Sequence, residues 1–209
     1  IIEEKILEIL EILKKWKFIE IKKDKILATR IGRRVSELYI DPLTAHHFIE
    51  CLNRAIKKEV TPFSFLQVIS NTEEMKPLLN IRTGEFSELN EKIAEREDQF
   101  LQKIPEEWDL EFDDFLRSVK TALMFEAWIN EATEDYILTK FKVAPGEFYG
   151  RREIADWLIY SLQELALLLR YKELLKPIRK LRVRLEYGVR EELIPLVRLK
   201  GIGRIRARK

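Results

Sequence analysis

The residue types that most often carry catalysis are few in this sequence and do not form a catalytic pattern. His46 and His47 are adjacent, so on a helix their rings diverge and cannot chelate one metal ion from a single face. The single cysteine, Cys51, has no histidine beyond these two to complete a zinc site. Serine and threonine residues have no histidine partner outside the same pair. We therefore expect neither a catalytic residue nor a metal site in this chain.

A nucleotide-binding motif is also absent from the sequence. It contains no G-x-x-x-x-G-K-[ST] segment, the loop whose backbone N–H groups cradle the phosphates of a nucleotide. The many carboxylates alternate with lysines at helical spacing, which fits surface ion pairs better than an acid–base dyad. We expect this chain on its own to hold no cofactor and to hydrolyse no ATP.

Charge is spread unevenly along a chain whose net charge is only +2. Residues 171–209 contain thirteen Lys or Arg and four Glu, whereas residues 73–135 contain eighteen acidic and seven basic residues. A basic end joined to an acidic body predicts polyanion binding at the basic end. The same pattern also fits solvated helix faces cross-linked by ion pairs, and charge alone does not decide between the two.

The basic end contains the turn Gly201-Ile202-Gly203 between a leucine-spaced helix and the opening of another helix. Two glycines allow a tight turn that exposes N–H groups at a helix N-terminus, where a phosphate oxygen can bind. Basic side chains surround the turn: Lys200, Arg204, Arg206 and Arg208. This setting is typical of a helix-hairpin-helix DNA-binding motif, although such turns also simply cap helices.

A long helix predicted over residues 148–170 carries a tryptophan away from its apolar stripe. At about 100° per residue, that stripe contains Ala155, Leu158, Ile159, Leu162, Leu165, Ala166 and Leu169. Trp157 lies roughly 140° from the centre of the stripe, so its ring must cover another surface. That surface is either a second layer of helices or a nucleic-acid base on which the ring stacks. Tyr160, Arg151 and Arg152 are close enough in sequence to assist such stacking.

Helices must position these residues, because apolar side chains recur at helical spacing through most of the chain. We predict helices over residues 1–16, 30–39, 44–57, 87–104, 112–131, 133–141, 148–170 and 172–187, and one that begins at Thr61-Pro62. Short β-prone runs at 18–21 and 26–28 flank a charged segment and predict a hairpin. The first helix has no capping residue, so we expect the chain to begin inside a larger protein.

Three further residues have predicted structural roles. Gly32 permits a close approach of the helix that follows the hairpin, and Gly188 ends the helix at 172–187. Trp128 is expected in the core, together with Phe125, Ile129 and Ala132, and not at a functional site.

Composition bounds the class of protein. A length of 209 residues corresponds to one or two domains, and 46% hydrophobic residues suffice for a sizeable core. Apolar runs fall short of the ~18 residues that a membrane span needs, and no signal peptide is evident. A single cysteine suits a reducing cytoplasm. The bias toward Lys and Glu is the one reported for hyperthermophiles.

The sequence therefore predicts a mainly α fold. Residues 1–42 are interpreted as the C-terminal part of a winged helix that includes the short β-hairpin. Residues 43–188 form a large helical bundle, and residues 189–209 form a truncated helix-hairpin-helix motif.

Several segments, in this order and spacing, resemble a known family. They are residues 29–45, 120–123, 128–131, 143–147, 157–158 and 184–208. The resemblance covers essentially the whole chain. The chain resembles the region outside the motor of the archaeal Holliday-junction-migration helicases of superfamily 2.

The resemblance implies that two RecA-like motor domains precede residue 1 and bind ATP and Mg²⁺. The full-length protein would be an ATP-dependent 3′-to-5′ DNA helicase acting on forks and Holliday junctions. In the family, the bundle closes a ring around the single strand, a long ratchet helix stacks bases, and the helix-hairpin-helix motif grips the emerging strand. The family's ratchet tryptophan corresponds to Trp157. Its ratchet arginine corresponds to Gly150, so we expect the basic contact at Arg151 or Arg152.

The expected partners are single-stranded and forked or branched DNA, the motor domains of the same protein, and replication or repair proteins. One alternative is a protein-interaction scaffold that docks a replication or repair partner through its acidic face. Another is an RNA-directed relative, because related bundles occur in RNA helicases.

Overall fold

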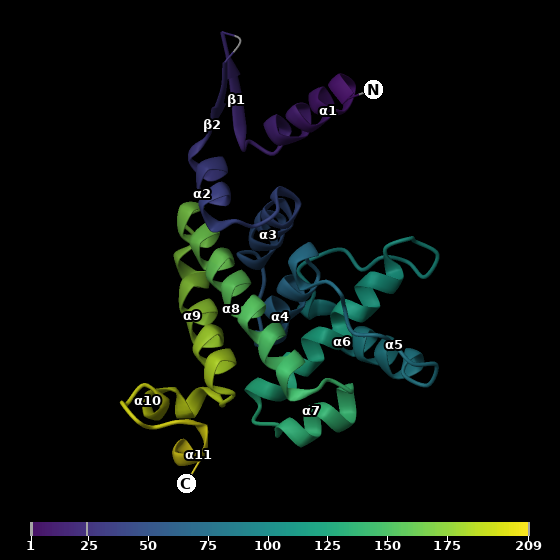
Figure 1. Ribbon diagram of the computed structural model, residues 1–209, viewed down its shortest axis with the longest axis vertical. Helices are drawn as coiled ribbons and strands as arrows, with labels where there is room; N and C mark the ends of the chain where they lie inside the picture. Colours follow the sequence, from purple (N-terminus) through teal and green to yellow (C-terminus); the bar gives the residue numbers. More distant parts are fainter. Residues whose placement is uncertain (1, 24, 209) are drawn as a thin grey trace.

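The computed structural model describes residues 2–23 and 25–208, and helices dominate it (Figure 1). The strands are β1 (Ile19–Lys22) and β2 (Lys25–Ala28). The α-helices are α1 (Ile2–Lys15), α2 (Arg30–Leu38), α3 (Pro42–Ala55), α4 (Pro62–Ser70), α5 (Phe86–Glu95), α6 (Phe112–Ile129), α7 (Glu134–Phe141), α8 (Pro145–Leu168), α9 (Lys172–Tyr187), α10 (Ile194–Val197) and α11 (Arg204–Ala207). Single 3-10 turns are η1 (Glu73–Met75), η2 (Glu97–Gln99) and η3 (Glu191–Leu193). The mainly α fold with a small β-hairpin is confirmed.

The β-hairpin is anchored to α2 by a close backbone contact. β1 and β2 are antiparallel, with Ile19 opposite Ala28. Thr29 caps α2 by accepting a hydrogen bond from the Gly32 N–H, and its hydroxyl donates to the Lys17 carbonyl oxygen at 2.7 Å. A Cβ atom on Gly32 would lie 1.9 Å from the Phe18 carbonyl oxygen. The close approach predicted at Gly32 is therefore confirmed. The predicted start of α1 at Ile1, the hairpin residue Asp24 and the chain end at Lys209 lie outside the described residues.

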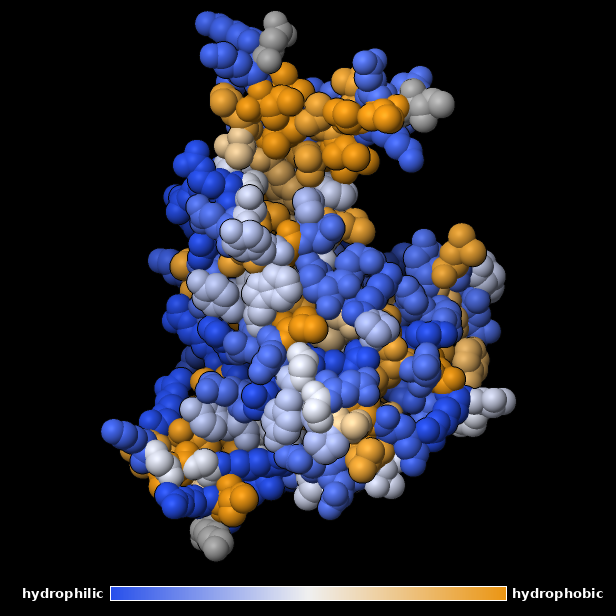
Figure 2. Space-filling view, in the orientation of Figure 1, coloured by the Kyte–Doolittle hydropathy of each residue, from blue (hydrophilic) through white to orange (hydrophobic). Residues whose placement is uncertain are grey.

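α1 and the hairpin extend away from the bundle and expose apolar side chains (Figures 1 and 2). α1 contains no buried residue among those described. The exposed apolar residues of this part are Ile2, Ile6, Leu7, Ile9, Ile12, Ile21, Ile26 and Leu27. An apolar surface of this extent usually faces another protein surface.

The core of the bundle lies around α4, α6, α8 and α9. α4 is central: all its residues after Pro62 are buried, and it contacts α6, α8 and α9. Its start is fixed by a capping box in which Thr61 and Ser64 bond each other's backbone N–H groups. α9 ends at Gly188, whose φ of +63° lies in the left-handed region. The predicted start of α4 and end of α9 are both confirmed.

One predicted helix was wrong in extent. Residues 87–104 do not form one helix, because α5 ends at Glu95 and the chain becomes extended by Phe100. Burial explains the break, since Phe100 packs against Phe63 and Phe115 with ring centroids 5.6 and 5.4 Å apart. Leu101 is buried beside it. The extended backbone at Phe100 thus places both residues in the core, where the rings of Phe63 and Phe115 already lie.

The C-terminal segment has a small core of its own beside the main one. Val189, Val197 and Ala207 form a separate buried cluster, with half-buried Ile202 packed against it. The division into residues 1–42, 43–188 and 189–209 stays a prediction.

Candidate nucleic-acid interface

α8 carries Trp157 and crosses the centre of the molecule in contact with α3, α4 and α9 (Figure 1). Pro145 occupies its first turn, where the missing N–H costs no hydrogen bond. The predicted apolar stripe is fully buried over Ala155, Leu158, Ile159, Leu162, Leu165 and Ala166. Leu169, just beyond the helix, is half-buried. The predicted core face is confirmed, and it fixes the rotation of α8 about its axis.

The outward side of α8 packs against α2, and Trp157 lies in that contact. Its indole Nε1 donates a hydrogen bond to the Leu38 carbonyl oxygen at 2.9 Å, and the side chain is half-buried. Two turns further along, the Arg34 guanidinium pairs with Glu164 at 2.6 Å and donates to the Tyr160 hydroxyl. The hydrogen bond to Glu164 raises the pKa of Arg34 above its ordinary value. α2 thus forms a second layer that orients the Trp157 ring, while Trp157 as a whole is only half-buried.

Arginines cover two other aromatic rings of α8. The Arg152 guanidinium lies 4.9 Å from the ring centroid of Tyr149 and donates to the Glu186 carbonyl oxygen at 2.8 Å. Arg182 of α9 lies 5.0 Å from the ring centroid of Tyr160. Such cation–π contacts stabilise ring orientations by about 0.5–1 kcal/mol at exposed sites. Arg152 and Tyr160 therefore already have partners within the protein.

The side chains of Arg151 and Arg152 do not lie on the same face as Trp157. At 100° and 1.5 Å per residue, Gly150 lies within about 20° of Trp157 and about 10 Å from it along the helix axis. Arg151 and Arg152 are rotated from Gly150 by about 100° and 200°. The structure therefore brings neither arginine alongside the tryptophan.

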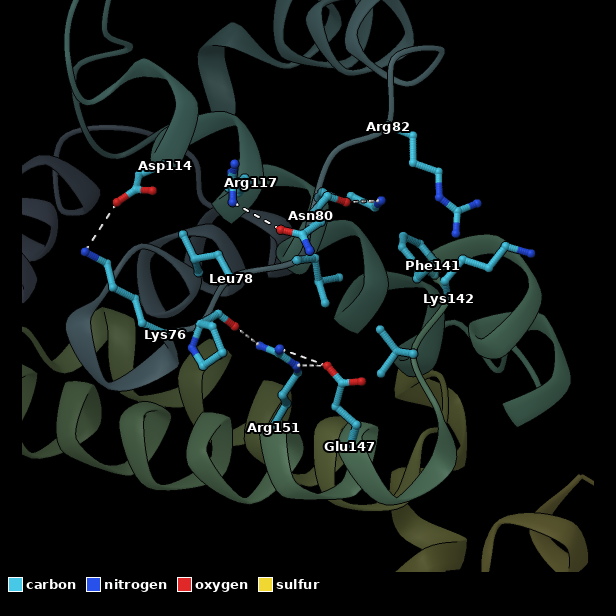
Figure 3. Close-up of a pocket in the computed structure, with 14 residues that line it drawn as sticks. Lys76, Leu78, Asn80, Arg82, Asp114, Arg117, Phe141, Lys142, Glu147 and Arg151 are labelled. Carbon is cyan, nitrogen blue, oxygen red and sulfur yellow. Dashed lines mark hydrogen bonds and ion pairs between the residues drawn. The ribbon is translucent and has the colours of Figure 1, made fainter.

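Arg151 instead enters a basic cleft of about 970 Å³ beside the N-terminal half of α8 (Figure 3). It pairs with Glu147 at 2.9 Å and donates to the Pro77 carbonyl oxygen at 2.6 Å. The cleft's charged side chains are Lys76, Arg82, Arg117, Lys120, Lys142 and Arg151, with Asp114 and Glu147. Most of these cations have carboxylate partners, but Arg82 and Lys142 have no ion pair among the described residues. The cleft therefore has two cations free to meet an anion.

Arg204, one of the predicted DNA contacts of the C-terminal turn, holds this turn against the bundle. Gly201 has a φ of +82°, and the Arg206 guanidinium donates to its carbonyl oxygen at 2.7 Å. Arg204 points the other way, 4.0 Å from the ring centroid of Trp128, and also donates to the Ala132 carbonyl oxygen. Burial lowers the pKa of Arg204.

The remaining residues of this turn face solvent. Lys200, Gly201, Gly203 and Arg206 are exposed, and no ion pair of Lys200 or Arg206 occurs among the described residues. A phosphate can therefore reach these two cations without breaking an ion pair.

Trp128 joins the turn to the bundle. It is buried as predicted, and its Nε1 donates to the Leu185 carbonyl oxygen at 2.8 Å. Gly188 lies against one side of the ring and Arg204 over its face. The C-terminal turn and the end of α9 therefore share one aromatic anchor.

Comparison with known proteins identifies the family of this bundle. Residues 63–188, which span α4 to α9, match the family described as archaeal helicase, domain 4. The chain belongs to this family. It is 42% identical over 209 residues to the ATP-dependent DNA helicase Hel308 of Pyrococcus horikoshii, a match that covers 99% of this chain and 28% of that protein.

Two further relatives have the same name. The protein of Methanocella arvoryzae is 39% identical over 194 residues, covering 91% of this chain and 26% of its own length. That of Thermococcus kodakarensis is 42% identical over 186 residues, covering 88% of this chain and 16% of its own length. The chain therefore spans between 16% and 28% of the length of these relatives.

The predicted site residues fall into three groups, of which those on α8 lie within residues 63–188 that match the archaeal helicase family. Trp157 and Tyr160 lie together on α8 beneath α2, whereas Arg151 and Arg152 lie on other sides of that helix. The predicted residues of the C-terminal turn form the third group. Sequence reasoning missed the basic cleft because its residues 76–82 form an irregular segment without periodic spacing.

The two histidines and the cysteine contact other residues of the fold through stacking and hydrogen bonds. His46 stacks on Trp16, with centroids 4.4 Å apart, while the His47 ring contacts the Val68 carbonyl oxygen. Sγ of Cys51 lies 3.8 Å from Nδ1 of His47, a proximity that the sequence did not predict. Burial lowers the pKa of His47 to about 4 and raises that of Cys51 to about 12, so both are neutral near pH 7.

No group of three or more His, Cys, Asp or Glu among the described residues could hold a metal ion. None of the described helices combines the length and apolar character needed to cross a membrane.

Proposed function

We propose that this chain is the DNA-handling, non-motor region of an ATP-dependent 3′-to-5′ DNA helicase that acts on forks and Holliday junctions. The observation that carries the proposal is 42% identity over 99% of the chain to a protein named ATP-dependent DNA helicase. In this proposal ATP and Mg²⁺ bind RecA-like motor domains elsewhere in the same protein. The chain itself supplies grip on the strand.

In this role, α8 is the ratchet helix. Stacking of a base on an aromatic ring contributes about 1–3 kcal/mol and does not depend on base identity. A ring that already has one fixed orientation loses little conformational entropy on binding, and the Leu38 hydrogen bond of Trp157 provides that fixation. The accessible part of the Trp157 side chain would stack on a base, and the free cations Arg82 and Lys142 would attract phosphates toward the other side of α8.

The motor domains would cover the exposed apolar surface of α1 and the hairpin. This surface is built from leucine and isoleucine side chains, which favour contact with another apolar surface. The inter-domain contact would place the ring-forming bundle beside the motor. Other replication or repair proteins would bind elsewhere on the acidic body.

Salt-dependent binding tests the proposal. Fluorescence anisotropy of labelled single-stranded and forked DNA, titrated with the chain at several salt concentrations, should give affinity that falls as salt rises, because bound counterions are released. Replacing Lys200→Gln and Arg206→Gln should flatten the log–log salt slope by about 0.7 to 0.9 for each phosphate that is no longer neutralised. Arg204 is left intact in this design because it anchors the turn to Trp128. An RNA strand of the same sequence is the matched ligand. Tighter binding to RNA would favour the RNA-directed alternative, and an absence of binding to either strand would contradict the proposal.

A further inference from the structure

The outer side of α9 carries a row of cations that the proposed ratchet does not use. Lys172, Lys176, Arg179 and Lys180 are spaced by four, three and one residues, which places them on one helix face over about 12 Å. The opposite face of α9 is buried through Leu174, Ile178, Leu181 and Leu185. The cationic face is therefore held rigidly outward by the packing of α9 onto the bundle.

This face forms one wall of a groove of about 710 Å³ whose other wall is α10. Arg198, just after α10, adds a fifth cation. Apolar side chains line the rest: Leu167, Leu175, Ile194 and Pro195. In Figure 2, hydrophobic residues over α10 are surrounded by hydrophilic ones.

Positive charge in the groove is largely uncompensated. Among the described residues that line it, Glu191 is the single acidic one, and Glu191 pairs with Lys180. Lys172, Lys176, Arg179 and Arg198 are exposed, and the part of the chain that the structure describes provides none of the four with an ion-pair partner. Most cations of the basic cleft beside α8, in contrast, have carboxylate partners. The α9–α10 groove is therefore better suited to an external polyanion.

We propose that the α9–α10 groove binds the sugar–phosphate backbone of a DNA strand, in addition to the contacts proposed for Trp157 and for Lys200 and Arg206 of the C-terminal turn. None of the described residues that line the groove is aromatic, so it offers no stacking surface and reads charge instead of base identity. Its aliphatic side chains can pack against deoxyribose carbon atoms. Lys200 follows Arg198 by two residues, so the cationic surface continues into the turn. That continuity favours an extended polyanion over a short acidic peptide.

This inference rests on the proposed function, because it assumes that the chain binds DNA. The test compares Lys176→Gln/Arg179→Gln with a matched control, Lys5→Gln/Lys103→Gln, which removes the same charge from exposed positions on α1 and the 100–111 segment. Single-stranded dT oligonucleotides and a mixed-sequence duplex are titrated by fluorescence anisotropy. Thermal midpoints verify that all variants remain folded.

Each phosphate that the variant no longer neutralises should weaken binding about five- to eightfold at about 0.1 M salt. This factor is the contribution of one phosphate to the salt slope, about 0.7 to 0.9, applied over the tenfold range of salt concentration between about 1 M and 0.1 M. The groove variant should therefore bind both DNA forms more weakly and flatten the salt slope, whereas the control variant should match the unmodified chain. Equal affinities of the groove variant and the control would overturn the groove while leaving α8 binding intact. An unmodified chain that binds no DNA would overturn the groove and the proposed function together. A poly-glutamate peptide whose binding is abolished in the groove variant, with DNA binding unchanged, would assign the groove to an acidic protein instead.

Discussion

Gly188→Ala should strongly destabilise the protein, because two independent features of the structure require glycine there. The residue ends α9 with a φ of +63°. A Cβ atom at this position would lie 2.5 Å from Cε2 and 2.7 Å from Cζ2 of Trp128. Trp128 cannot move freely, because its Nε1 bonds the Leu185 carbonyl oxygen and Arg204 covers its ring.

The expected loss is the sum of a backbone and a packing contribution. The left-handed conformation costs a residue with a Cβ atom about 1–2 kcal/mol. Forcing an extra methyl group into a packed core costs about 1–3 kcal/mol. Together they predict that the free energy of unfolding falls by about 2 to 5 kcal/mol.

Urea denaturation followed by circular dichroism measures this loss, and Gly150→Ala is the matched control. Gly150 lies inside α8 without a positive φ, and a Cβ atom there would have no neighbouring atom of the described residues within 4 Å. Alanine there should stabilise the protein by about 0.5–1 kcal/mol, because glycine inside a helix loses more backbone entropy. The same substitution therefore has opposite signs at the two sites. A loss below about 1 kcal/mol at Gly188 would refute the packing argument.

Three other predictions concern titration, anchoring and activity. Burial lowers the pKa of His47 from 6.5 to about 4. The free energy of unfolding should therefore be highest above pH 6.5 and fall by at most about 3 kcal/mol as the pH decreases toward 4, because the unfolded state takes up the proton more readily. Urea midpoints between pH 4 and 7 should depend less on pH in His47→Gln, and parallel curves would contradict this. Arg204→Met should speed amide hydrogen exchange around residues 198–208 and spare α4, since Arg204 anchors the turn through Trp128; unchanged exchange would contradict the anchor. The chain alone should hydrolyse no ATP with or without DNA, because its sequence lacks a phosphate loop; hydrolysis that co-purifies with the chain would contradict this.

Local sequence signals were sufficient where one residue determines a boundary. Thr61-Pro62 predicted the start of α4, and Gly188 predicted the end of α9, because capping depends on the residues at the helix end. The break after α5 was not predictable in this way. It depends on Phe100 meeting Phe63 and Phe115, which are distant in the sequence.

The candidate site was predictable only in part for the same reason. Helical periodicity correctly separated Trp157 from the core face of α8. It could not indicate that Trp157 bonds Leu38, because that contact joins residues 119 positions apart. Nor could it indicate that Arg204 turns inward onto Trp128, since charge in a sequence carries no direction. Clusters such as the α9–α10 groove appear only when the fold brings separate segments together.

Binding of single-stranded DNA by Trp157 variants tests the central claim most directly. Trp157→Ala removes both the ring and the Leu38 hydrogen bond, whereas Trp157→Phe removes the hydrogen bond and retains a ring. Leu162→Ala, in the buried stripe, should cost about 2–5 kcal/mol of stability without a specific binding defect. Anisotropy titrations are made at a temperature where all variants are folded. The account predicts that Trp157→Ala loses about 1–3 kcal/mol of binding free energy while Trp157→Phe retains most of it. A folded Trp157→Ala protein with unchanged affinity would contradict the proposal that α8 grips the strand.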